Sequence, residues 1–235
     1  VVNVVLGVFA VFFLGGMPKL IGHMGAQVLF TVVACTMALA ALVMALAFPN
    51  FGPEVSPSTQ GPVMVNRRIP RAAWFAIGVV MCLTLNQAMV FSFVERIGMA
   101  RGFGVDAVHM VLIALGLVNL TPGVLAALLQ KKWSPIAVGM GGPVAQAALA
   151  VTMSSAVAFA SYAVAASLYV FMVIFTHTFI FGLLSRLDPS GRTVAGTPAM
   201  MMVGSCIGPA LGGGIVQTFG YSGLGWAACG VAFVA

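Results

Sequence analysis

Long apolar stretches separated by short polar segments dominate the pattern of this chain. A membrane-spanning helix needs about 20 apolar residues, because each residue adds about 1.5 Å and the hydrocarbon layer is about 30 Å thick. Eight stretches fit this requirement, and we expect the first to lack its start and the last its end. They are residues 1–17, 27–47, 74–94, 105–128, 135–157, 160–184, 193–217 and 222–235. The pattern predicts an all-α membrane protein, a polytopic helical bundle with eight spans in this fragment.

One connection is much longer than the others and differs from them in composition. Residues 49–73 contain five prolines with glycine, serine and asparagine between them. Proline cannot continue a helix, and such a mixture is typical of a linker. We therefore expect 49–73 to join two membrane bundles, one that ends at residue 48 and one that begins at residue 74.

The composition agrees with lipid as the main solvent. The chain is 61% hydrophobic and only 6% charged, whereas soluble domains are about 25% charged. This excludes a water-soluble domain. The net charge of +6 would suggest nucleic acid in a soluble chain, but here the charges lie between apolar stretches, where they report membrane orientation instead.

The lysines and arginines predict which loops face the cytoplasm, because cytoplasmic loops carry an excess of these residues. Three loops on one side hold seven of the ten basic residues: Arg67, Arg68, Arg71, Lys131, Lys132, Arg186 and Arg192. The other side holds Lys19, Arg96 and Arg101. The long linker is therefore expected to be cytoplasmic, in a multi-pass protein of a bacterial inner membrane.

This orientation gives a first testable prediction. A reporter fused at Ser58, in the linker, should be active only as a cytoplasmic marker, and one fused at Gly102 only as a periplasmic marker. The seven-to-three division of basic residues is the reason for both expectations. The reverse pair of activities would contradict the orientation.

Residue patterns for catalysis or metal binding are not found. The four cysteines lie inside apolar stretches without C-x-x-C spacing or neighbouring acids, so we interpret them as core residues. No H-E-x-x-H sequence, nucleophile elbow or phosphate-binding G-x-x-x-x-G-K-[ST] loop occurs. We expect a protein that is not an enzyme and has no cofactor.

A glycine and proline motif lies in the seventh stretch. Gly204, Gly208, Pro209, Gly212 and Gly213 fit the pattern G-x-x-x-G-P-x-x-G-G. Residues Gly204 and Gly208 form a small-xxx-small face for a neighbouring helix, and Pro209 allows a kink. The motif resembles the antiporter motif of drug exporters in the major facilitator superfamily, here in the expected eleventh helix, which is repeat-related to the motif's usual place in the fifth.

Two loops are similar to cytoplasmic elements of the same superfamily. Residues 123–132 resemble its loop signature, with Ala127 where the acid is expected and Gln130 near the loop glycine, while the basic pair Lys131 and Lys132 is present. The loop 187–192 contains Asp188 and Arg192, which can pair with each other or with helix ends. We interpret these four charged residues as a cytoplasmic gate.

The resemblance implies a fold and a function. Residues 1–48 would be the last two helices of an N-terminal bundle, helices five and six, and 74–235 the six-helix C-terminal bundle. The expected function is secondary active transport of a small organic solute by alternating access, with protons as the coupling ion, as in drug antiporters. An uptake symporter for an organic acid or sugar is the alternative, and a membrane-embedded enzyme is a further one. The full-length protein is expected to be monomeric in the bilayer.

Polar residues inside the spans are candidates for substrate contact, because such groups are costly in hydrocarbon. Asn86, Gln87 and Asn119 lie near mid-span, and the alternative for each is a hydrogen bond between helices. His177 can exchange protons near neutral pH or remain a neutral core residue. Tyr169, on the same stretch, can face a cavity or pack. Gln146 has no assigned role.

A charged pair closes the first span after the linker. Glu95 and Arg96 lie at the expected outer interface. They can form an external gate, or they can be solvated residues at a helix end.

Overall fold

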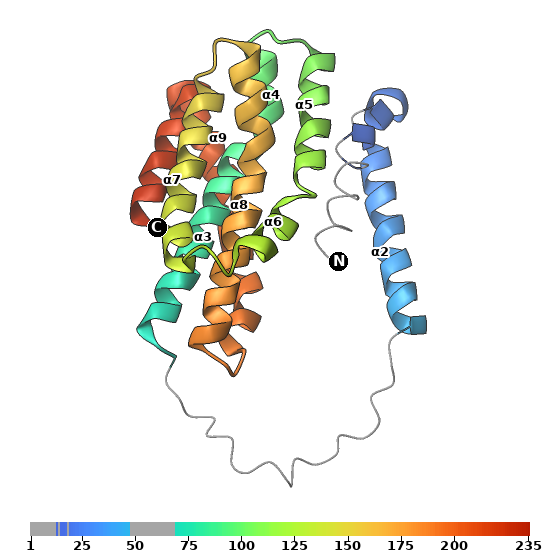
Figure 1. The fold of residues 1–235 in the computed structure, drawn as a ribbon. Helices are drawn as coiled ribbons and strands as arrows, with labels where there is room; N and C mark the ends of the chain where they lie inside the picture. Colours follow the sequence, from blue (N-terminus) through green and yellow to red (C-terminus); the bar gives the residue numbers. More distant parts are fainter. Residues whose placement is uncertain (1–12, 14, 18, 48–68) are drawn as a thin grey trace. The chain divides into compact units, whose positions relative to one another are not determined.

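The computed structural model describes residues 13, 15–17, 19–47 and 69–235. These residues form helices and turns, with no strand among them. The helices are α2 (Gln27–Ala47), α3 (Arg71–Phe91), α4 (Val94–Ala100), α5 (Val105–Val118), α6 (Pro122–Leu129), α7 (Pro135–Ser154), α8 (Phe159–Leu187) and α9 (Arg192–Val234). Figure 1 shows their arrangement. The described residues fall into two compact units, one containing 19–47 and the other 69–235.

Among the described residues, six helical segments are long and apolar enough to cross a membrane. They are α2, α3 with α4 (Arg71–Ala100), α5 with α6 (Val105–Leu129), α7, α8 and α9. The chain is therefore an all-α protein built of candidate membrane-spanning helices. The stretch 1–17 and the linker 49–73 lie mostly outside the described residues, so the count of eight spans and the role of the linker stay predictions.

Helix α9 spans 43 residues and is folded back on itself at Gly220. Gly220 has φ 68° and ψ −175°, a conformation essentially restricted to glycine. Gly208 packs against Ala88, and the Asn86 amide donates a hydrogen bond to the Ala228 carbonyl. In a straight helix residues 208 and 228 would be about 30 Å apart, yet both reach the same turn of α3. The arms 192–219 and 221–234 therefore run in opposite directions beside α3.

The crossing formed by α5 and α6 is interrupted at residues 119–121. Pro122 has no N–H to donate to Val118, and instead the Thr121 amide and hydroxyl both bond the Val118 carbonyl, at 3.1 and 2.8 Å. The helix therefore ends after Val118 and restarts at Pro122. The break leaves the Asn119 side chain at the interruption.

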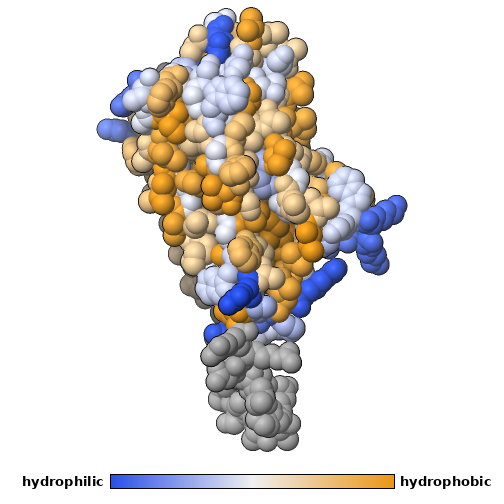
Figure 2. All heavy atoms as spheres, turned by 90° about the vertical axis from the view of Figure 1, so that its left-hand side faces the viewer, coloured by the Kyte–Doolittle hydropathy of each residue, from blue (hydrophilic) through white to orange (hydrophobic). Residues whose placement is uncertain are grey.

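Apolar side chains cover much of the surface. Phe75, Met140 and Phe233 are 76%, 72% and 93% exposed, and no residue of α2 is buried. Figure 2 shows apolar residues over most of the visible face, with hydrophilic residues gathered toward its ends. In water such a surface would be unstable, whereas lipid tails solvate it without cost.

The largest core cluster lies where α4, α5, α7, α8 and the second arm of α9 meet. It includes Ile97, Val108, Tyr162 and Leu224, all fully buried. The Tyr162 hydroxyl donates to the Val94 carbonyl at 2.8 Å, so its polar tip is satisfied inside this core. This core joins α7, α8 and the second arm of α9 at one end of the bundle.

Candidate functional site

Three helices are joined by a buried polar network centred on Tyr169. The Tyr169 hydroxyl of α8 donates to the backbone carbonyl of Asn86 in α3 at 2.8 Å. The Gln146 amide of α7 donates to the Leu83 carbonyl at 3.2 Å and to the Tyr169 oxygen at 3.4 Å. The side chains of Asn86, Gln146 and Tyr169 are at most 1% exposed. These hydrogen bonds fix the middle of α3 relative to α7 and α8.

The network extends to the second arm of α9 and ends in two unpaired oxygens. The Asn86 Nδ2 donates to the Ala228 carbonyl at 3.4 Å. Asn86 Oδ1 and Gln146 Oε1 are buried and accept no hydrogen bond from the described residues. An unsatisfied buried acceptor costs about 1–3 kcal/mol, so this cluster favours a donor such as a water molecule, a hydroxyl or an ammonium group.

Asn86 and Gln87 occupy different environments although they are neighbours. Asn86 is enclosed by other helices, whereas Gln87 is half-buried, and no hydrogen bond of its side chain is found in the described part of the chain. Neighbours on a helix point about 100° apart, which accounts for the difference. Of the two, Gln87 is the one with a side chain accessible to a solute.

Asn119 lies alone at the break between α5 and α6. Its side chain is 7% exposed, and its Oδ1 atom has no hydrogen-bond partner among the described residues. At the break, which lies near the middle of a crossing, the amides of Leu120 and Thr121 bond carbonyls three residues back instead of four. Interrupted helices of this kind supply backbone and side-chain ligands in transporters.

His177 is also separate from the Tyr169 network. It lies eight residues beyond Tyr169 on α8, about 12 Å along the helix axis. Its ring stacks on Phe181 with centroids 5.8 Å apart and contacts the Val80 backbone, while Nε2 is buried and has no hydrogen-bond partner within the described ranges. The imidazole is thus held in place between α3 and α8.

The glycine motif of α9 packs against α3. A Cβ atom added at Gly204 would lie 2.8 Å from the Met81 carbonyl oxygen, and one at Gly208 would lie 2.7 Å from the Met89 nitrogen. One at Gly212 would lie 2.7 Å from the Met89 carbonyl oxygen. The motif's other two residues differ, since a Cβ at Gly213 meets nothing within 4 Å and Pro209 is exposed.

The charged loop between α8 and α9 forms a helix cap. Asp188 accepts hydrogen bonds from the amide and hydroxyl of Ser190 through Oδ1, and from the Thr193 amide through Oδ2 at 3.1 Å. The Ser190 hydroxyl, together with these amides, holds the pKa of Asp188 below its ordinary value of 3.8. Asp188 therefore stabilises the start of α9.

The cap predicts a pH effect. A depressed pKa means that the ionised carboxylate stabilises the fold above pH 3.8, and that this contribution is lost as the pH falls below that value. We expect Asp188→Asn to lower the melting temperature more at pH 7 than at pH 3, as measured by thermal unfolding in detergent. An equal difference at both pH values would contradict a role for the charge.

Lys131 and Lys132, the other residues of the expected gate, lie in the turn between α6 and α7. Both are exposed. That these lysines and the α8–α9 loop act together as a gate stays a prediction.

The outer charged residues have partners that the sequence did not indicate. Glu95 lies 3.6 Å from His109 of α5, at the surface. The Arg101 guanidinium donates to the Ser154 carbonyl at 2.6 Å and to the Ser222 hydroxyl at 3.2 Å. Arg101 thereby links the loop before α5 to the end of α7 and the turn of α9.

Within the described ranges, no group of three His, Cys, Asp or Glu side chains is placed to hold a metal ion. Cys35, Cys82, Cys206 and Cys229 are free thiols. The chemistry of the site therefore rests on amides, hydroxyls, one imidazole and backbone groups.

No protein-family model, curated protein or solved structure matches this chain.

Proposed function

We propose that this chain belongs to a secondary active transporter that moves a small organic solute by alternating access. In this proposal residues 74–235 form the C-terminal six-helix bundle of a protein of the major facilitator type, and 1–48 supply helices five and six of the other bundle. Protons are the coupling ion and the direction is export, as in drug antiporters. Uptake of an organic acid or sugar by symport is the alternative.

The interrupted crossing at Asn119 carries the proposal. A break near the middle of a crossing is costly, because lipid offers no hydrogen bonds to the freed backbone groups. Such breaks occur where they line a cavity or bind a solute or ion. At this break Asn119 Oδ1 is buried and accepts no hydrogen bond from the part of the chain that the structure describes, so it can accept one from a solute.

The packing of α9 on α3 supports the same proposal. Close backbone contact along Gly204, Gly208 and Gly212 allows two helices to move as one body or to slide with little side-chain rearrangement. Alternating access requires such rigid units, which rock around a fixed site. Gln87, which is half-buried, directly precedes Ala88, one of the α3 residues in this contact.

Counterflow in proteoliposomes tests the proposal. The full-length protein is reconstituted and loaded with unlabelled ethidium, lactate or glucose, which represent lipophilic cations, organic acids and sugars. The same solute is then added outside in labelled form. A carrier accumulates label transiently when the inside is preloaded, whereas a channel only equilibrates it.

The proton dependence separates the two transport modes. An exporter of the antiporter type accumulates ethidium in inside-out vesicles when the lumen is acid, and a symporter takes up lactate or glucose together with protons from an acid exterior. Empty liposomes are the control. Equilibration without any preload effect, for every solute that crosses, would contradict a carrier.

A further inference from the structure

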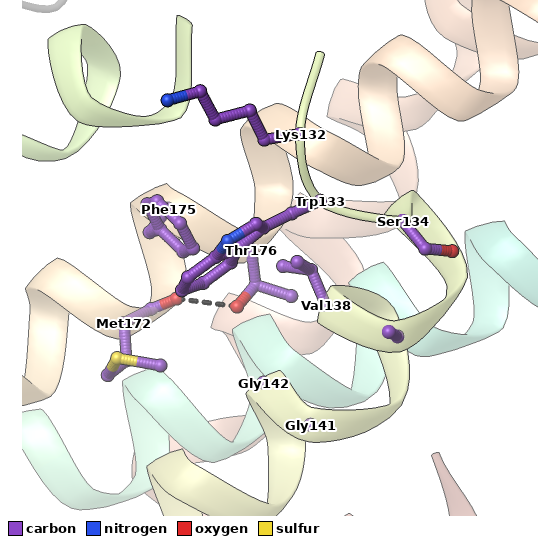
Figure 3. Close-up of a pocket in the computed structure, with 10 residues that line it drawn as sticks. Lys132, Trp133, Ser134, Val138, Gly141, Gly142, Met172, Phe175 and Thr176 are labelled. Carbon is purple, nitrogen blue, oxygen red and sulfur yellow. Dashed lines mark hydrogen bonds between the residues drawn. The ribbon is translucent and has the colours of Figure 1, made fainter. Parts of the chain in front are cut away.

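A groove of about 490 Å³ lies between the α6–α7 turn, α7 and α8. Figure 3 shows its lining, with the Trp133 indole lying over the floor and the Lys132 side chain extending along one edge. Trp133 is 51% exposed and meets Phe175 edge to face, with ring centroids 6.0 Å apart. The groove is therefore open to the surroundings at the point where α7 begins.

The floor of the groove is apolar. Val138, Met172 and Phe175 line it together with Gly141 and Gly142. The Thr176 hydroxyl, which also faces the groove, already donates to the Met172 carbonyl at 2.7 Å (Figure 3). A hydrocarbon chain suits this floor, where the Thr176 proton is already donated to a backbone carbonyl and the other floor groups are apolar side chains and glycines.

The edge of the groove is cationic. Lys132 lines it and Lys131 precedes Lys132 in the same exposed turn. None of the acidic residues in the described ranges, Glu95, Asp106 and Asp188, contributes to the lining. Tryptophan beside basic residues at the end of a crossing marks the level of the lipid headgroups. The groove thus combines an anion-attracting edge at headgroup level with an apolar floor below it.

We infer that this groove binds an anionic phospholipid, with its phosphate beside Lys131 and Lys132 and an acyl chain over the floor formed by Val138 and Gly141. Basic pockets between membrane helices bind acidic headgroups in this way. The inference does not depend on the proposed transport function, because a lipid of this kind is a bound component of the fold whatever the protein moves.

Native mass spectrometry of the full-length protein tests the inference. The protein in detergent is titrated with dioleoyl phosphatidylglycerol and, separately, with dioleoyl phosphatidylcholine. Each basic residue near an acidic headgroup contributes about fivefold in affinity, so the two lysines predict a preference of roughly 25-fold for phosphatidylglycerol. Replacing both, Lys131→Gln with Lys132→Gln, should abolish the preference and leave phosphatidylcholine binding unchanged. Arg186→Gln, which removes an exposed charge from the end of α8, is the matched control and should retain it.

A second variant tests the apolar floor. A Cβ at Gly141 meets nothing within 4 Å, so Gly141→Leu fills the groove without disturbing the contact of its neighbour Gly142 with Thr176. It should weaken phosphatidylglycerol binding at least tenfold. Gly214→Leu, on α9, adds the same side chain at another position where a Cβ meets nothing within 4 Å, and should bind as the unmodified protein does.

Three results would overturn the inference. One is equal affinity of the unmodified protein for the two lipids. Another is an equal loss of preference in Arg186→Gln and in the double lysine variant. The third is displacement of phosphatidylglycerol by millimolar inorganic phosphate, which would assign the lysines to a free anion.

Discussion

Gly208→Leu is expected to abolish transport by the full-length protein and to lower its melting temperature in detergent by several degrees. A Cβ at this position would lie 2.7 Å from the Met89 nitrogen and the Ala88 Cβ, and 2.9 Å from the Leu85 carbonyl oxygen. Two of these neighbours are backbone atoms, so α3 and α9 would have to separate. Overpacking of this kind costs about 1–3 kcal/mol.

The readouts are solute counterflow and thermal unfolding, with membrane insertion checked by the amount of protein in the membrane fraction. Insertion should be unchanged, because leucine raises the hydrophobicity of the helix. Gly213→Leu is the matched control, since it lies in the same motif and its Cβ would meet nothing within 4 Å. If both variants lost transport equally, the loss would not come from contact with α3.

The sequence was sufficient to predict the helices and the small-residue face of α9, because both depend on local spacing. A crossing of about 20 apolar residues and a glycine at every fourth position are visible without any tertiary information. The partner of that face was not predictable, since any of several helices offers a similar apolar surface. Only the fold identifies it as the segment of α3 from Met81 to Met89.

Helix ends and turns were predicted less well. Helix α8 continues to Leu187 rather than ending near residue 184, because Ser185 and Arg186 are compatible with a helix and Pro189 is the first residue that ends it. The turn at Gly220 falls between the stretches 193–217 and 222–235, as their separation suggests. Its glycine-only conformation could not be read from composition.

The polar network shows more clearly which contacts could not be predicted from the sequence. Asn86 and Tyr169 were candidates for substrate contact, yet the Tyr169 hydroxyl is bonded to the Asn86 carbonyl. Gln146, which had no assigned role, donates to the same tyrosine oxygen. A single glutamine in an apolar helix gives no sign of which residue it meets 23 or 63 positions away. One of its two partners is the Leu83 backbone carbonyl, and a backbone contact leaves no trace in residue type.

The last prediction separates the two roles considered for Asn86 and Gln87. Asn86→Ala should lower the melting temperature in detergent, because it removes the hydrogen bond to the Ala228 carbonyl and leaves space in a site that is 1% exposed. The hydrogen bond alone is worth about 0.6 kcal/mol in membrane helices. The apparent KM for the transported solute should not change.

Gln87→Ala should have the opposite pattern. Its side chain is half-buried and makes no hydrogen bond in the described part of the chain, so its loss should leave the melting temperature unchanged. If it contacts the solute, the apparent KM should rise roughly two- to twelve-fold, which corresponds to about 0.5–1.5 kcal/mol for a lost hydrogen bond.

Tyr169→Phe is the control that distinguishes packing from binding. It removes the hydrogen bond to the Asn86 carbonyl, which Asn86→Ala retains because that bond involves the backbone. If the network only ties helices together, Tyr169→Phe and Asn86→Ala should both reduce stability, and their effects on KM should be equally small. A rise in KM with Asn86→Ala at unchanged stability would instead mean that its unpaired Oδ1 meets the solute. In that case Asn86, the enclosed residue, would bind the solute in place of Gln87, the accessible one. The solute path would then pass through the middle of the bundle rather than along the Gln87 face of α3.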